Sequence, residues 1–271
     1  TWTNLAGGVW SVGGNWDVPN VAPGSGGSTN YTLAFTNNGA ASYVATNDIG
    51  TPDFTNNALV FWSTSTNSAR LTGSNIVLAA NGPTNPGIYQ GSSGAFVISN
   101  KLTLAANLTF WGPGWGTVAV AGNITGAGAV TFAGVNNTIL NNSNSFAGQV
   151  TVNTLGGMVT LSNVFAFGIS NNVSVSGGFV TNAAGAAYVF GNGVPNRTYQ
   201  IEGTNGAGAV WNNGGQNLTV GNGVATGIVL SVNGGLLTGI NNLTINTPSN
   251  SVIVANGGKG TAYNVTMSGA G

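Results

Sequence analysis

The sequence predicts an all-β protein built as a parallel β-helix, in which short strands stack coil upon coil. Three observations predict this fold: a composition poor in helix formers, a short motif that returns at near-regular steps, and glycine-rich and asparagine-rich pairs between the motifs. Glycine alone accounts for 46 of the 271 residues. Glycine and the β-branched residues that accompany it are poor helix formers, whereas strands and tight turns accommodate both.

The recurring motif reads polar, aliphatic, Thr or Ser, aliphatic, as in Lys101–Leu104 and Asn242–Ile245, with weaker copies at 75, 123 and 197. Successive copies lie 20 to 26 residues apart, which is a natural length for one coil of a parallel β-helix. The copies start at Asn75, Lys101, Asn123, Gln149, Asn172, Arg197, Asn217, Asn242 and Asn264.

Each copy of the motif is a short strand, in which alternate side chains point to opposite faces. The aliphatic positions are therefore expected to face the interior. We expect one residue from each of eight copies to stack as a single interior column, formed by Ile76, Leu102, Ile124, Val150, Val173, Leu218, Leu243 and Val265. No coil buries its apolar side alone, so the stability of such a fold comes from stacking on neighbouring coils.

A β-sandwich is the alternative fold, because its strands also recur with turns between them, at about 8–12 residues. Strands at that finer spacing are present here too, as they are in a three-sided coil. The return of one motif once per coil favours the solenoid.

Turn residues between the motifs are consistent with sharp corners. Asn38–Gly39, Gly156–Gly157, Gly234–Gly235 and Gly257–Gly258 supply residues that adopt positive φ easily. Asparagines stacked at equivalent corners are expected to hydrogen-bond to one another as a ladder.

The chain divides into an N-terminal aromatic-rich cap with the first strands, residues 1–65, and one continuous run of coils, residues 66–271. The first region holds four of the seven tryptophans, Trp2, Trp10, Trp16 and Trp62. Solenoids need caps on their open ends, and no second cap is predicted after the last motif. The chain begins at Thr1 rather than Met, as expected of an export substrate whose signal peptide has been removed.

One stretch resembles a known family. The segments Ile124–Phe132, Asn144–Asn153, Val159–Asn163 and Ala166–Gly168 resemble the autotransporter-associated β-strand repeat, with its Gly-x-Gly opening and its "N-x-[YF]-x-G-x-[TV]-x-[VI]-N" centre. The start of the chain, with Trp2 and then Trp10–Trp16, resembles the usual beginning of mature proteins with such repeats. The resemblance implies a right-handed β-helix exported to the bacterial surface, with no enzyme activity and no catalytic residues.

Few side chains are available for chemistry. The chain has four basic and four acidic residues, no histidine and no cysteine, and its net charge is zero. We therefore predict no enzyme activity, no catalytic residues, no cofactor and no metal. Zero net charge means that the chain has no excess of positive charge with which to bind nucleic acid. Its apolar stretches are too short to span a membrane.

Two groups of residues, a pair of aspartates and a cluster of aromatic residues, can each be interpreted either as a functional site or as part of the structure. Asp48 and Asp53 are interpreted either as a carboxylate pair or Ca²⁺ site, or as turn residues beside Gly50 and Pro52, and the turn is favoured. Phe110, Trp111 and Trp115 are interpreted either as an aromatic platform for a sugar or another partner, or as a loop packed on the flank of the solenoid.

The predicted function is that of an extracellular structural protein, a subunit of a bacterial surface filament that self-associates into a homopolymer by stacking of coils. A neutral surface is poorly protected against self-association, and open strand edges favour assembly. The alternative is a monomeric adhesin or passenger domain that binds a glycan or a surface, with Trp111 and Trp115 as contacts. Ice binding is a third, less favoured hypothesis, because most coils offer only one column of threonine.

Overall fold

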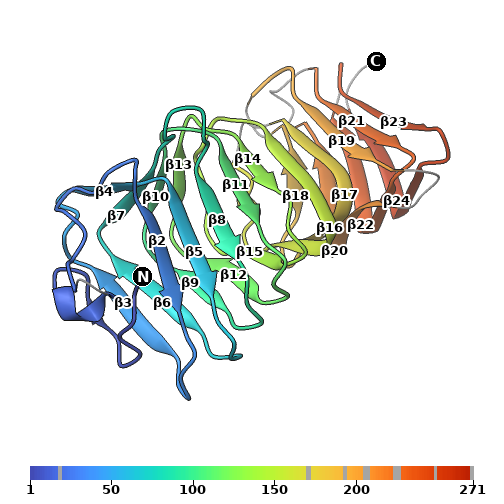
Figure 1. Cartoon of the computed structure of the whole chain (residues 1–271). Helices are drawn as coiled ribbons and strands as arrows, with labels where there is room; N and C mark the ends of the chain where they lie inside the picture. Colours follow the sequence, from blue (N-terminus) through green and yellow to red (C-terminus); the bar gives the residue numbers. More distant parts are fainter. Residues whose placement is uncertain are drawn as a thin grey trace.

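The computed structural model describes residues 1–17, 20–168, 172–191, 194–203, 208–221, 227–246 and 249–268. These residues form a β-solenoid of about 10 coils with almost no helix, as predicted (Figure 1). Every ladder between strands of the described residues is parallel, which excludes the β-sandwich. Residues 269–271, part of the end predicted to lack a cap, lie outside the described residues.

Each coil has three faces. The first face stacks, in order, β2 (Thr32–Thr36), β5 (Ala58–Trp62), β8 (Gly87–Gln90), β11 (Leu108–Trp111), β14 (Val130–Phe132), β16 (Val150–Leu161), β17 (Val173–Asn182), β19 (Thr198–Glu202), β21 (Val229–Asn233) and β23 (Ser251–Ala255).

The second face begins with β1 (Gly8–Val9), β3 (Tyr43–Asn47), β6 (Ala69–Gly73), β9 (Phe96–Ile98), β12 (Thr117–Val120) and β15 (Asn137–Leu140). The second halves of β16 and β17 follow, because both strands bend around the corner from the first face. The first halves of β20 (Ala209–Val220), β22 (Leu236–Asn246) and β24 (Lys259–Ser268) complete it.

The third face starts with β4 (Asp53–Asn56), β7 (Asn75–Leu78), β10 (Leu102–Leu104) and β13 (Ile124–Gly126). In the next two coils the described residues of this face form no strand, and buried Phe146 and Phe167 fill it. The face resumes with β18 (Tyr188–Phe190) and the second halves of β20, β22 and β24.

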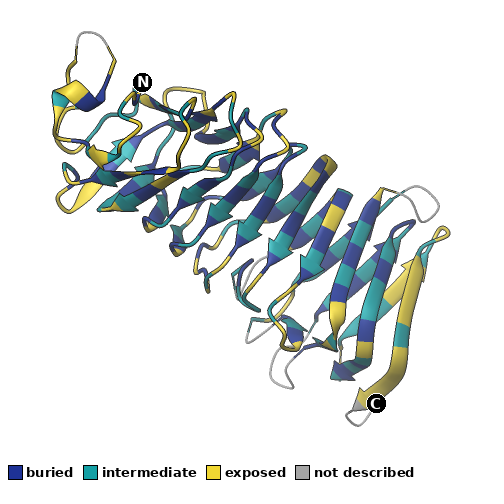
Figure 2. Cartoon of the chain, turned by 90° about the horizontal axis from the view of Figure 1, so that it is seen from below, coloured by how far each residue is buried: buried dark blue, intermediate teal, exposed yellow. Residues whose placement is uncertain are grey.

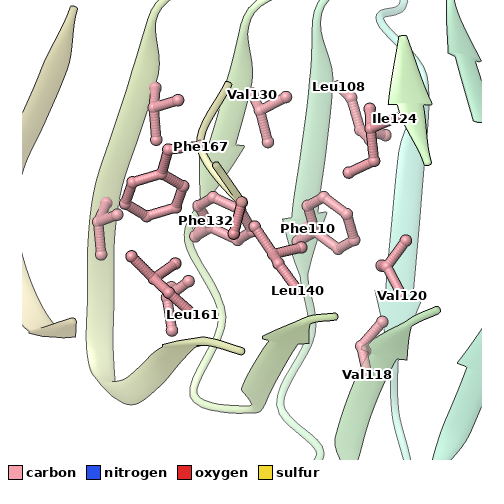
Figure 3. Close-up of a cluster of buried hydrophobic side chains, with 14 of the residues drawn as sticks. Leu108, Phe110, Val118, Val120, Ile124, Val130, Phe132, Leu140, Leu161 and Phe167 are labelled. Carbon is pink, nitrogen blue, oxygen red and sulfur yellow. The ribbon is translucent and has the colours of Figure 1, made fainter. Parts of the chain in front are cut away.

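The core is a continuous column of side chains from inward positions of all three faces. Phe110 and Phe132 stack with ring centroids 5.0 Å apart, and Phe167 continues the stack 6.0 Å from Phe132 (Figure 3). Stacked identical or similar side chains on successive coils bury apolar surface that one coil leaves open, which is how a solenoid obtains its stability.

The prediction of a single interior column is wrong. Ile76, Leu102 and Ile124 align on the third face, but Val150 and Val173 align on the first face. Leu218, Leu243 and Val265 align on the third face again. The cause is the coil length: Val150 aligns with Val130, 20 residues earlier, so the 26-residue step from Ile124 to Val150 exceeds one coil and moves the motif to another face.

The eight residues also differ in burial. All face the core and are buried except Val265, which is 62% exposed. Val265 belongs to β24, and no described coil lies beyond it. The exposure of this inward-facing side chain therefore marks the open end of the described solenoid.

The N-terminal cap is shorter than predicted. Trp2, Trp10 and Trp16 are buried, and Trp10 lies edge-on to Phe54 of the first coil with ring centroids 5.2 Å apart. Regular coils begin at Thr32, so the boundary at residue 65 falls within the solenoid. Trp62 is not part of the cap, because it lies half-exposed on the flank.

Asparagine ladders form as predicted. The Nδ2 of Asn242 donates to Oδ1 of Asn217 at 2.9 Å, and the Nδ2 of Asn264 donates to Oδ1 of Asn242 at 2.8 Å. Gly234 and Gly257, at the same corner of successive coils, have φ of 73° and 77°, which only glycine adopts without strain. No helix of the described residues is both long enough and apolar enough to cross a membrane.

Candidate interaction surfaces

The carboxylates that were candidates for chemistry hold strands and turns together. Asp48 accepts hydrogen bonds from the backbone N–H of Ser11, at 2.8 Å, and from its hydroxyl. Asp53 accepts one from the Nδ2 of Asn75 on the next coil. No group of three or more His, Cys, Asp or Glu side chains suited to a metal ion occurs among the described residues.

The environment of Asp48 favours its ionised form. Desolvation opposes ionisation, but hydrogen bonds to the carboxylate, first those from Ser11 and then those from the backbone of Asp48 and Trp10, outweigh it and hold the pKa of this carboxyl below its ordinary value of 3.8. Ser11 follows β1 and Asp48 follows β3, so the charged group fastens the cap to the first coil. The turn interpretation gains support from Asn47, whose Oδ1 accepts from the N–H groups of Ile49 and Gly50.

The aromatic cluster predicted around residue 111 separates into two environments. Phe110 was predicted as a partner contact, and this is wrong, because Phe110 is buried in the core stack. Trp111, the next residue of β11, points outward and is 48% exposed, and Trp115 in the following loop is 73% exposed. Alternation along the strand separates the neighbours, since successive side chains point to opposite faces.

Trp111 belongs to a row of large outward-pointing side chains from several coils, all of them exposed except Tyr89, which is partly buried. Trp62 of β5 stacks on Tyr89 of β8 with an interplanar angle of 7° and centroids 6.0 Å apart. Tyr89 meets Trp111 edge to face at 4.5 Å. The row continues past the coil of β14 with Leu155 of β16, 77% exposed, and Phe179 of β17, 48% exposed. We call Trp62, Tyr89, Trp111, Leu155 and Phe179 the corner row, because they lie at or beside the corner between the first and second faces.

Two open hollows separate the last three members of the corner row. The first lies between Trp111 and Leu155 and is also lined by Gly112, Pro113, Ala133, Gly134 and Val135. The second lies between Leu155 and Phe179 and is also lined by Asn153, Thr154, Gly156, Gly177, Gly178 and Gly208. Small residues between large apolar ones make these hollows, and no lining residue is ionisable.

Sequence reasoning found Trp111 but missed Tyr89, Leu155 and Phe179. These residues are far apart in the sequence and become neighbours only when the coils are stacked in register. Trp62 was noted only as one of the aromatic residues of the cap. For Tyr89 and Phe179 the available signal was an outward position next to a buried apolar residue of the same strand, Ile88 and Val180.

The two ends of the described solenoid differ. At the N-terminal end, residues of the cap pair with each strand of the first coil. Strand β1 pairs with the edge of β3. Trp2 forms a β-bridge with Phe35 of β2, and Gly27 forms one with Thr55 of β4. At the other end, β23 and β24 pair with the preceding coil only. Figure 2 shows exposed residues gathered on the last strands of that end. The large apolar side chains exposed there are Ile253, Val254, Tyr263, Val265 and Met267.

An apolar hollow opens into the core at this end. Leu237, Leu243, Val252 and Val265 contribute to its lining. We call the outer edges of β23 and β24, with this hollow, the open end.

Comparison of the chain with protein-family models, with curated proteins and with solved structures finds no match in any of the three. The class of the protein comes from the fold alone. It is a parallel β-solenoid, closed at one end of its described coils and open at the other. The candidate sites on it are two surfaces, the open end and the corner row.

Proposed function

We propose that this chain is an extracellular structural protein of the bacterial surface, without catalytic activity, that self-associates through its open end and serves as the subunit of a filament. The observation that carries the proposal is the open end itself. The outer edges of β23 and β24 have no strand partner among the described residues, and they lie beside apolar side chains that face the core, such as Val265. An edge of this kind is a template for pairing with another chain.

The charge of the molecule supports association. Charged side chains on edge strands normally prevent pairing between chains. Of the described residues of β23 and β24, only Lys259 carries a charge. With four basic and four acidic residues and zero net charge, two copies meet without general repulsion.

The closed end fixes the order of assembly. Because the cap already pairs with all three edges of the first coil, two copies pair first through their open ends. Growth into a filament then requires a second contact at the capped end, where Val12 and Val21 are exposed.

Two further parts of the proposal have separate support. Export and surface location draw on the resemblance of residues 124–168 to the autotransporter-associated repeat. The non-catalytic role draws on the lack of histidine and cysteine, and on the engagement of Asp48 by Ser11.

Sedimentation velocity over a range of concentrations tests the assembly. The chain should shift from one rod to pairs and longer species as its concentration rises. Val265→Lys places a charge on the open end and should keep the chain monomeric, whereas Val12→Lys, at the other end, should leave pair formation unchanged. A monomer at every concentration, or equal behaviour of the two variants, contradicts the proposal.

A monomeric adhesin is the second candidate function, and the corner row favours it. Large exposed apolar side chains gathered along one corner are typical of interaction sites. A chain that stays monomeric and binds a surface through this row would replace the assembly proposal.

A further inference from the structure

We infer that the corner row binds a neutral polysaccharide chain lying along the axis of the solenoid. The inference rests on the binding role that the second candidate function gives to the corner row, and not on a monomeric state, and it names the ligand class. It does not require the open end, so self-association and polysaccharide binding stand or fall separately.

The rigidity and spacing of the row match such a ligand. Trp62, Tyr89 and Trp111 each lie on a strand, and neighbouring strands of a sheet are about 4.8 Å apart, which is close to the length of one sugar ring. Contacts between the rings, at 6.0 and 4.5 Å, hold them in place before any ligand arrives. A site held in its binding conformation loses little entropy on binding.

The first hollow offers a surface against which a sugar ring can stack. Trp111 forms one wall and Leu155 the other, with Ala133 and Gly134 between them. An aromatic face carries partial negative charge, and the axial C–H groups of a pyranose carry partial positive charge. A flat sugar ring therefore fits against Trp111, with its hydroxyl groups directed to solvent.

The second hollow combines an apolar wall with a polar group. Phe179 and Leu155 flank it, and the exposed Asn153 lies between them. An amide side chain both donates and accepts hydrogen bonds, as recognition of sugar hydroxyl groups requires. At Gly156 a Cβ atom would meet nothing within 4 Å, so this part of the floor is open to a ligand.

The lack of charge selects a neutral chain. None of the residues that line the two hollows is ionisable. A uronic acid polymer, a sulfated glycan or a charged peptide would lose hydration here without gaining a partner of opposite charge.

Isothermal titration calorimetry with two derivatives of one backbone tests the ligand class. Hydroxyethylcellulose is neutral and carboxymethylcellulose is anionic; dextran, galactomannan and arabinoxylan extend the neutral set. The chain should bind at least one neutral polymer and should bind carboxymethylcellulose more weakly than hydroxyethylcellulose.

Variants then test the site. Trp111→Ala should weaken binding of the best neutral polymer about tenfold, equivalent to about 1.4 kcal/mol. Leu155→Asn, at a side chain too exposed to affect folding, should also weaken it. Val44→Ala shortens a side chain of β3 that is 43% exposed and lies outside both the corner row and the open end, and it is the control, with unchanged binding expected.

Three results would overturn the inference. Binding to none of the neutral polymers would reject it, and binding to carboxymethylcellulose alone would reject the neutral class while leaving an adhesin function standing. Equal binding by the Trp111→Ala, Leu155→Asn and Val44→Ala variants would reject the corner row as the site.

Discussion

Replacing Phe132 with alanine tests whether the aromatic stack in the core holds neighbouring coils together. Phe132 is 1% exposed and lies between Phe110, at 5.0 Å, and Phe167, at 6.0 Å. Truncation of a buried phenylalanine costs about 3–5 kcal/mol. Each aromatic contact adds about 0.5–1.5 kcal/mol beyond area burial, so the loss of two contacts places Phe132→Ala near the upper end, at about 4–5 kcal/mol.

The matched control is Thr131→Ala, which changes the adjacent residue of β14 on the outward side. A surface substitution of this kind usually changes stability by less than about 0.5 kcal/mol. Guanidinium chloride unfolding followed by far-UV circular dichroism gives the free energy of unfolding of both variants. Because a solenoid coil contacts only its neighbours, hydrogen exchange should locate the loss of protection in the coils around β11, β14 and Phe167.

A small effect of Phe132→Ala, similar to that of Thr131→Ala, would refute the assignment of inward and outward positions on the first face. A large effect of Thr131→Ala would refute it as well, because the two residues point to opposite sides of the same strand.

Two further predictions concern turns and the cap. Gly122→Ala should destabilise the chain by about 1–3 kcal/mol, because a Cβ atom there would lie 1.9 Å from the carbonyl oxygen of Asn100. Gly14→Ala is the control: a Cβ atom at Gly14 would meet nothing within 4 Å, so this variant should be close to neutral in the same unfolding assay. Similar stability of the two variants would contradict the close approach of these coils. Acidification should loosen the cap, because folding lowers the pKa of Asp48. The stability that the ionised Asp48 gives to the folded state is present above the ordinary carboxyl pKa of 3.8 and is lost as the pH falls through the pKa of the folded state. Tryptophan fluorescence should therefore show a smaller acid-induced change in Asp48→Asn than in the unaltered chain, and identical acid profiles would exclude a role for this carboxylate.

The fold was predictable because one local pattern recurs once per coil over much of the chain. The motif at Leu102 and Leu243 shows both the period of two along a strand and the longer period of the coil. The face on which each copy lies was not predictable. Corner loops differ in length, so Val173 aligns with Tyr199 after 26 residues, whereas Val130 aligns with Val150 after 20.

The limits of the cap show a second cause of error. The strands from Thr32 to Trp62 carry large aromatic residues inward, such as Phe35 and Phe61, in place of the aliphatic motif. They therefore differ from the later coils in sequence while they stack in the same parallel manner.

The corner row shows how much of a surface site the sequence contains. Alternation along β11 separates buried Phe110 from exposed Trp111, and this could have been derived from the strand alone. The approach of Tyr89, Leu155 and Phe179 to the same corner depends on the register of the coils and on how β16 and β17 bend. Long-range register of this kind is not encoded in any local segment.

Electron microscopy of the purified chain tests the central claim, that the open end joins copies of this solenoid. About 10 coils at about 4.8 Å each give a rod of about 48 Å. The account predicts rods of double length and filaments that lengthen with concentration, and single rods for Val265→Lys. Single rods of the unaltered chain at every concentration, or clusters joined side by side, would contradict it.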